Sequence, residues 1–312
     1  MNDAQAVWLD DKLYLGGGWS SKEIRDDARL YIYIPTTDMW RIINTPVLWF
    51  ALVSYHSHLV LVGGREYVNE EQDGPVTNKL WTLTEYDELW MVAELDQWRE
   101  ILPPMISKRQ RASAMEFTSN ILVAGGEDEE DDCIGSVEVY DGHHWAKAQG
   151  LPIPCYWMKS AVLNGHWYLM GGGEQGEEVY FASLNSLLAS CPYNEKPLPY
   201  IWRTLHDAPN EWSSTAVLTN RLIAVGGGGF GVSPSSSIYA YHPHSPHSQP
   251  WVHVGNVPVG LSCTCSAVLP TGELMVIGGW SSSSTSKAYV YQGTLLGKKF
   301  KLAYVLMYPK MH

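Results

Sequence analysis

Apolar and turn-forming positions recur along the chain in one pattern that occurs six times. Each copy has a short apolar run, a polar turn and a second apolar run that ends in paired glycines. The copies begin at Ala6, Ala51, Ser113, Ser160, Thr215 and Ser266, and their glycine pairs begin at Gly16, Gly63, Gly125, Gly171, Gly226 and Gly278. Strand-length apolar runs around Asn-Gly, Asp-Asp, Thr-Asn, Ser-Asn or Thr-Gly are typical of β-hairpins. The pattern therefore predicts six hairpins, and no helical periodicity competes with it.

A third and a fourth strand are predicted after each hairpin. The third strands, rich in aromatic and β-branched residues, are expected at 30–34, 80–83, 137–140, 179–182, 238–241 and 288–291. The fourth opens with tryptophan in five copies (Trp40, Trp98, Trp145, Trp202 and Trp251) and with Phe300 in the sixth. Five copies then reach a proline, which cannot sit in a central strand and so marks the exit to the next copy. In the second copy, 89–93 is an alternative third strand; we prefer 80–83 because its distance from the glycine pair matches the other copies.

Paired glycines, a tyrosine- or valine-rich strand and a downstream tryptophan, repeated six times over nearly the whole chain, resemble the kelch repeat family. The glycine pairs lie 47, 62, 46, 55 and 52 residues apart, close to the kelch period of about 50. The resemblance implies an all-β fold, a six-bladed β-propeller whose blades are four-stranded antiparallel sheets. It would form one domain over 1–312, with blades near 1–47, 48–105, 106–153, 154–210, 211–259 and 260–312. A sheet of this size cannot bury both faces alone, so blades must pack on their neighbours.

Within this fold the recurring residues have expected structural roles. The glycines allow a sharp turn where a side chain would clash, and the tryptophans pack between blades. We expect the insertions at 84–97, 185–200 and 242–250 to be surface loops, the second with room for a short helical turn.

Composition limits the partners and the compartment. The chain has 21 Lys and Arg against 33 Asp and Glu, a formal net charge of −12, which disfavours a nucleic-acid partner. No apolar run approaches membrane-spanning length, and the first repeat starts too early for a signal peptide. Five cysteines at irregular spacing do not indicate a disulfide framework. These features predict a cytoplasmic protein without membrane association.

Candidate metal and cofactor sites are weak. His242, His244 and His247 could reach a metal, but prolines separate them and no fourth ligand is evident. Cys263 and Cys265 would share one face of a strand, which favours a buried pair over metal ligands. The acidic run 127–132 could bind a cation or a basic partner, or be a solvated loop, and the glycine-rich run 226–231 precedes no helix that could bind a phosphate. We predict no metal and no cofactor; the copper ligands of kelch oxidases cannot be placed here.

The resemblance points to one face of the fold as the binding site. In kelch proteins that recruit partners, loops after the glycines and loops between blades meet at one rim, and an arginine at the position of Arg111 reads acidic peptides. Aromatic and arginine side chains dominate binding hot spots. The predicted partner-binding residues are Trp19, Arg65, Arg109, Arg111, Trp157, Lys159, Trp212, Phe230 and Trp280.

Two functions are compatible with these features. The first is a non-catalytic interaction module that binds a partner protein or peptide, similar to the kelch domain of BTB-kelch ubiquitin-ligase adaptors, although this chain has no BTB domain. The alternative is an enzyme acting on a small sugar-like substrate in the channel mouth, as the sialic acid epimerases of the family do, with Arg111, Lys159 or a rim glutamate as its site. Converging acid and base groups would favour the enzyme, and a broad rim of exposed tryptophans the interaction module.

Overall fold

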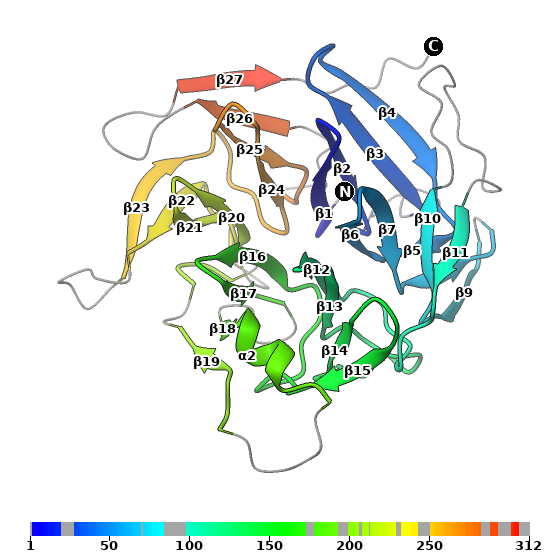
Figure 1. The fold of residues 1–312 in the computed structure, drawn as a ribbon. Helices are drawn as coiled ribbons and strands as arrows, with labels where there is room; N and C mark the ends of the chain where they lie inside the picture. The colour runs from blue at the N-terminus through cyan, green and yellow to red at the C-terminus, as the bar shows by residue number, and fades with distance from the viewer. Residues whose placement is uncertain are drawn as a thin grey trace. The chain divides into compact units, whose positions relative to one another are not determined.

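A computed structural model of the chain describes residues 2–19, 28–69, 71–83, 98–172, 178–192, 199–205, 208–211, 213–228, 232–242, 250–281, 288–292 and 301–305. Nearly all the regular structure in these ranges is β. The strands form six four-stranded antiparallel sheets and one three-stranded sheet (Figure 1).

The six large sheets repeat the predicted order of a hairpin followed by two strands. In one of them, Ser113 lies opposite Ala124 and Tyr140 lies opposite Trp145. Their strands are β1 (Gln5–Leu9), β2 (Lys12–Gly16), β3 (Arg29–Ile34) and β4 (Met39–Asn44); β6 (Ala51–Tyr55), β7 (His58–Val62), β10 (Leu80–Leu83) and β11 (Trp98–Leu102); β12 (Ser113–Phe117), β13 (Asn120–Ala124), β14 (Val137–Tyr140) and β15 (Trp145–Ala148); β16 (Lys159–Leu163), β17 (His166–Met170), β18 (Val179–Ser183) and β19 (Arg203–Thr204); β20 (Ser214–Leu218), β21 (Arg221–Val225), β22 (Ser237–Tyr241) and β23 (Trp251–Asn256); β24 (Cys265–Val268), β25 (Leu274–Ile277), β26 (Ala288–Gln292) and β27 (Lys301–Val305). The preferred third strand of the second copy, β10, is confirmed.

Five of the hairpins close through turns in which both central residues have φ between 46° and 71°. Positive φ at both positions defines the type I′ turn, whose twist matches that of the flanking strands. The turn pairs are Asp10-Asp11, His56-Ser57, Thr118-Ser119, Asn164-Gly165 and Thr219-Asn220. The third turn thus lies one residue before the Ser-Asn pair that the sequence indicated, and Asn120 instead donates its side-chain amide to the carbonyl of Thr118 at 3.0 Å.

The glycine pairs occupy positions where a side chain would clash, as predicted, and one of them lies against the next repeat. A Cβ atom on Gly63 would lie 2.4 Å from the carbonyl oxygen of Arg109 in the next repeat, and one on Gly64 would lie 2.4 Å from that of Leu48. The N–H of Gly64 donates to the Arg109 carbonyl at 2.8 Å. A side chain at either position would break this contact, and φ of +103° at Gly64 favours glycine independently.

The fourth-strand tryptophans also join neighbouring repeats. The indole Nε1 of Trp98 donates to the carbonyl of Asn44 at 2.8 Å, and that of Trp145 donates to the carbonyl of Pro103 at 2.7 Å. Each tryptophan therefore reaches back to the point where the preceding repeat ends.

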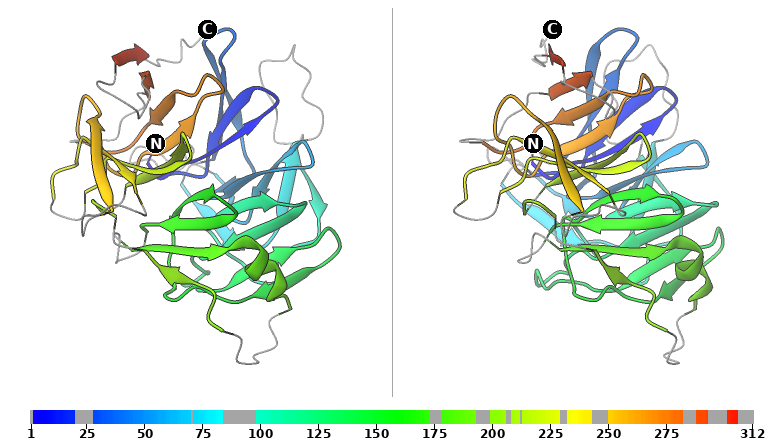
Figure 2. Two further views of the ribbon diagram at one scale, coloured as in Figure 1. Left: turned by 60° about the vertical axis from the view of Figure 1, so that its left-hand side comes forward. Right: turned by 90° about the vertical axis from the view of Figure 1, so that its left-hand side faces the viewer.

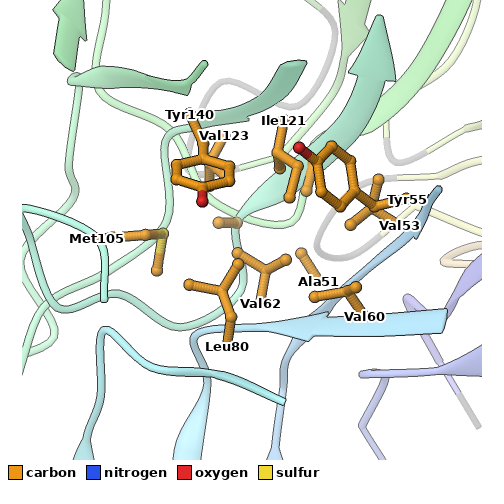
Figure 3. Packing of buried hydrophobic residues seen from close by; sticks show 12 residues of the cluster. Ala51, Val53, Tyr55, Val60, Val62, Leu80, Met105, Ile121, Val123 and Tyr140 are labelled. Carbon is orange, nitrogen blue, oxygen red and sulfur yellow. The ribbon is translucent and has the colours of Figure 1, made fainter. Parts of the chain in front are cut away.

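Apolar side chains of two neighbouring sheets form a continuous core (Figure 3). Those of β6, β7 and β10 face those of β13 and β14. Its central members are Ala51, Val53, Val60, Val62, Leu80, Ile121, Val123 and Tyr140. The views in Figure 2 show the twist of the sheets that this packing accommodates.

The insertion at 185–200 contains the short helical turn for which the sequence had room, α2 (Leu184–Ala189), whereas the insertion at 84–97 lies outside the described residues. The unpredicted three-stranded sheet consists of β5 (Val47–Leu48), β8 (Arg65–Tyr67) and β9 (Asp73–Val76). In the part of the chain that the structure describes, no helix has the length and apolar character needed to cross a bilayer.

The chain divides into two compact units. The first comprises Met1–Asp3, Met158–Ser183 and Trp202–His312, and the second comprises Ala4–Trp157 and Leu184–Ile201. The second unit contains β1 to β15 with α2, and it holds the cluster of functional side chains described next.

Candidate functional site

Three residues that each precede a first strand by two positions lie on a ladder of backbone hydrogen bonds. Arg111 N–H donates to the carbonyl of Trp49, and Trp157 N–H donates to the carbonyl of Arg111, both at 2.8 Å. All three have left-handed φ, at 51° for Trp49, 56° for Arg111 and 51° for Trp157. This conformation is uncommon for bulky residues and is maintained only where surrounding contacts impose it. The ladder thus brings side chains from three successive repeats together.

The Arg111 guanidinium lies between two indole rings. Its Cζ is 4.3 Å from the ring centroid of Trp49 and 4.5 Å from that of Trp157. Arg65 approaches Trp49 as well, with Cζ 6.0 Å from the ring centroid. Both cations are attracted to the electron-rich faces of the rings, so these four side chains form a cluster with little freedom to change rotamer.

Glu127 supplies the carboxylate of the site. It follows the third glycine pair, is 4% exposed, and accepts a hydrogen bond on Oε2 from Nη1 of Arg111. Burial raises the pKa of Glu127 above its ordinary value, and the nearby charge of Asp131 raises it further, although the charge and hydrogen bond of Arg111 act in the opposite direction. A buried carboxyl group with a raised pKa beside a fixed cation is a candidate general acid or base.

A second layer of polar groups supports Glu127. Gln110 donates from Nε2 to Asp131 Oδ1 at 3.0 Å and accepts on Oε1 from Arg65 Nε, also at 3.0 Å. Arg65 also forms two ion pairs: its Nη2 lies 3.6 Å from Asp131 Oδ1, and its Nε lies 3.7 Å from Asp73 Oδ2. Both arginines of the cluster are therefore paired with carboxylates.

Two donors in the cluster have no hydrogen-bond partner among the described residues. They are Arg111 Nε and Trp157 Nε1, both buried atoms. A buried donor without an acceptor costs about 1–3 kcal/mol.

The predicted site residues fall into separate groups. Arg65, Arg111 and Trp157 lie together in this cluster. Trp19 and Trp280 are 39% and 41% exposed, and Trp280 exchanges backbone hydrogen bonds with Ser262. Trp212 and Phe230 lie outside the described residues.

Two predicted binding residues are in fact buried. Arg109 has no exposed surface; its Nη2 pairs with Glu138 Oε1 at 2.5 Å, and its Nη1 donates to the carbonyl of Gly125 at 2.8 Å. Lys159, in the other unit, pairs with Asp3 at 2.8 Å and is 8% exposed. The expectation that Arg109 and Lys159 present their charges to a partner is corrected, because both charges are used within the fold.

Sequence reasoning missed Trp49 and Gln110. Trp49 occupies the same place before its strand as Arg111 and Trp157, so aligning the repeats at their first strands would have found it. Gln110 carries no such signal, because only its backbone pairing with Glu127 reveals its position.

The other candidate groups have structural partners. In the acidic run, Asp128 Oδ1 accepts the N–H groups of Glu130 and Asp132, and Glu129 accepts that of Val76. This run is therefore an ordered turn held against β9. His244 and His247 lie outside the described residues. Within the described ranges, no group of three or more His, Cys, Asp or Glu side chains is arranged to hold a metal ion.

Of the two neighbouring cysteines, Cys265 is buried and Cys263 is partly exposed. Burial raises the pKa of Cys265 to about 12 and also raises that of Cys263. Cys263 precedes β24 at a left-handed φ of 55°, and its thiol lies against Asp3, whose negative charge raises its pKa further. The interpretation of this pair as buried residues on one strand therefore holds for Cys265 and is wrong for Cys263.

Comparison with known proteins shows the fold. No family model matches the sequence, and no curated protein matches it. Among solved structures 239 chains match. One of them is the structure of YjhT, with a TM-score of 0.70 and 13% identity over 97% of each chain. The chain therefore shares the fold of YjhT, and its four-stranded antiparallel sheets are consistent with a β-propeller.

This comparison corrects the predicted function. The match to YjhT is the finding that counts against the predicted non-catalytic adaptor, and it agrees better with the alternative given above, an enzyme. The prediction of an interaction module is therefore wrong, and the match also weighs against the expectation that the chain is not an enzyme.

Proposed function

We propose that the chain is an enzyme that catalyses proton transfer on a small sugar-like substrate, and that Glu127, Arg111, Trp49 and Trp157 form its site. The observation that carries this proposal is the buried Glu127 carboxyl, with its raised pKa, paired to an arginine that two indole rings enclose. The six similar four-stranded sheets and the likeness to YjhT support a six-bladed kelch propeller as the scaffold.

Glu127 is the acid and base in this proposal. With its pKa raised toward the working pH, the carboxyl group can give and take a proton in the same cycle. For a cyclic sugar, the Glu127 proton passes to the ring oxygen while the bond from that oxygen to the anomeric carbon breaks. The anomeric hydroxyl becomes the carbonyl and gives its proton to Asp131 or to solvent. Reversal closes the ring on either face and restores Glu127, so the reaction interconverts anomers.

The other residues bind and orient the substrate. Indole rings offer large apolar surfaces against which the C–H face of a sugar ring can pack. Arg111 Nε and Trp157 Nε1 are buried donors without a partner among the described residues, and a movement of the rings that exposed them would let them donate hydrogen bonds to substrate oxygens. Arg111 also holds the Glu127 carboxylate through Nη1.

The test is a measurement of anomer interconversion by exchange NMR with a panel of neutral reducing sugars and sugar acids. We expect a saturable, protein-dependent rate with at least one class, and a loss of about a hundredfold or more in Glu127→Gln. The matched control is Glu100→Gln, which removes an exposed carboxylate that pairs with Lys79 at 3.0 Å. Unchanged activity in Glu127→Gln, or no activity with any sugar tested, would refute the proposal.

A further inference from the structure

Gln110 is fully buried between the loop that carries Arg111 and the turn that carries Glu127. Its backbone N–H donates to the carbonyl of Glu127, and its own carbonyl accepts the N–H of Glu127, both at 2.9 Å. This isolated β-bridge fixes the two residues directly opposite each other. Their side chains are therefore held in register by the main chain.

The side-chain amide of Gln110 is fully used. Nε2 donates to Asp131 Oδ1 at 3.0 Å and, more weakly, to Glu127 Oε2 at 3.4 Å. Oε1 accepts from Arg65 Nε at 3.0 Å. A primary amide has two donor hydrogens and one acceptor oxygen. Turning the amide over would face its N–H groups toward the guanidinium and its oxygen toward two carboxylates, so only one orientation satisfies the network.

We propose that Gln110 is a positioning residue that orients the Glu127 carboxyl and joins it to Arg65 and Asp131. This inference rests on the proposed role of Glu127 in proton transfer. Gln110 itself is buried behind the carboxyl group and acts through it. Arg111, which the cation–π cluster holds in place, and the Gln110 amide both donate to the same carboxylate oxygen, Oε2 of Glu127.

The network predicts the direction of the electrostatic effect. Among the described residues, the charged groups that face Glu127 are Arg111 and Asp131, with Arg65 linked to it through Gln110. The Gln110 hydrogen bond favours the ionised carboxylate and so lowers the pKa of Glu127, in opposition to burial. Burial and the charge of Asp131 raise the pKa of Glu127, so removal of the Gln110 amide should raise this pKa further.

The decisive variant is Gln110→Met, which keeps the length of the side chain and removes its donors and acceptor. Its matched control is Gln149→Met, because Gln149 is another buried glutamine of the same unit whose amide binds Ile201 N–H at 2.7 Å away from the site. We expect both variants to lose stability. Only Gln110→Met should shift the titration of Glu127, followed by carbon NMR of labelled glutamate without substrate, to higher pH.

Kinetics give a second readout. In Gln110→Met the pH profile of kcat should move in the same direction, with a roughly tenfold or greater loss at the wild-type optimum. Gln110→Glu keeps the acceptor for Arg65 and adds a negative charge, so it should raise the pKa of Glu127 further. This variant provides the same test if Gln110→Met does not fold. An unchanged Glu127 titration in both Gln110 variants overturns the inference even if the enzyme is active. A shift without sugar activity supports the positioning role and counts against the proposed reaction.

Discussion

Arg111 donates its backbone N–H to the carbonyl oxygen of Trp49 at 2.8 Å, and both residues are held at left-handed φ. The other unit contains the same relationship, because Asp3 donates to the carbonyl of Cys263 at 2.7 Å with φ of 56° and 55°. A constant backbone geometry thus presents a side chain at the same place in the five repeats where this position is described. Function in such repeats resides in the side chains that this scaffold presents.

The first prediction concerns the strain at this position. Arg111→Ala and Arg111→Gly remove the same contacts, but glycine adopts positive φ without the penalty of about 1–2 kcal/mol that a Cβ atom incurs. We expect Arg111→Gly to be more stable than Arg111→Ala by about 1 kcal/mol in urea unfolding. At the neighbouring Ala112, where φ is not positive, Ala112→Gly should instead destabilise the protein. Equal stability of the two Arg111 variants would show that the position is unstrained.

Local patterns predicted the large sheets because each hairpin is encoded within about a dozen residues: two apolar runs, a turn and paired glycines. The small sheet of β5, β8 and β9 escaped prediction because its strands have two to four residues. β9 even contains Gly74 and Pro75, which argue against a strand. The sheet forms because β5, in the loop between the first two repeats, pairs with β8, which follows Gly63 and Gly64. The short local sequence of each strand does not indicate this pairing.

The run Arg109-Gln110-Arg111 illustrates the limit for the site. Arg109 and Arg111 were both predicted to face a partner, yet Arg109 enters the core and Arg111 stacks between the tryptophans. Gln110 between them was not predicted, and it contacts Glu127. One sequence signal was available: Glu138 interrupts the apolar strand β14, and a charge there requires a buried partner. The partner, Arg109, is identified only by the folded structure.

The second prediction tests that buried pair. Arg109→Met leaves the Glu138 carboxylate in the core without its cation, and we expect a loss of about 3–5 kcal/mol in the free energy of unfolding. Arg109→Met combined with Glu138→Leu should recover part of this loss, because no uncompensated charge remains, whereas the N–H groups of Ile106 and Ser107 lose their acceptor. Lys79→Met, which removes a half-exposed cation paired with Glu66 and Glu100, should cost no more than about 1 kcal/mol. A double variant as unstable as Arg109→Met would contradict the explanation.

The third prediction concerns thiol reactivity. The thiolate is the reactive form, and burial raises the pKa of Cys191 to about 11 and that of Cys265 to about 12. Cys133 is exposed. At pH 8 a thiol reagent should therefore modify Cys133 first, as peptide mass mapping would show, react slowly with the partly exposed Cys191, and reach the buried Cys265 only after unfolding. Cys133→Ser should abolish the fast phase, whereas rapid labelling of Cys265 in the native protein would disagree with its burial.

The last prediction follows from linkage between the Glu127 proton and folding. Burial raises the pKa of Glu127 in the folded state above the ordinary value of 4.5 that applies after unfolding. At pH values between 4.5 and the higher pKa of the folded state, the folded protein holds this proton more tightly than the unfolded chain does. The contribution of Glu127 to the free energy of unfolding therefore falls as pH rises through this range. The Glu127→Gln variant has no carboxyl group to titrate. Its lost ion pair with Arg111 changes the free energy of unfolding by an amount that does not follow the Glu127 titration.

The free energy of unfolding, measured by urea at a series of pH values, should therefore fall in the wild type relative to Glu127→Gln from about pH 4.5 upward and level off above the folded-state pKa. Arg111→Met should extend the fall to higher pH, because the Arg111 charge and hydrogen bond lower the pKa of Glu127. A wild type that instead gains stability over Glu127→Gln as pH rises would mean that the ion pair outweighs burial. Glu127 would then be ionised throughout and could not supply the proton that the proposed reaction requires.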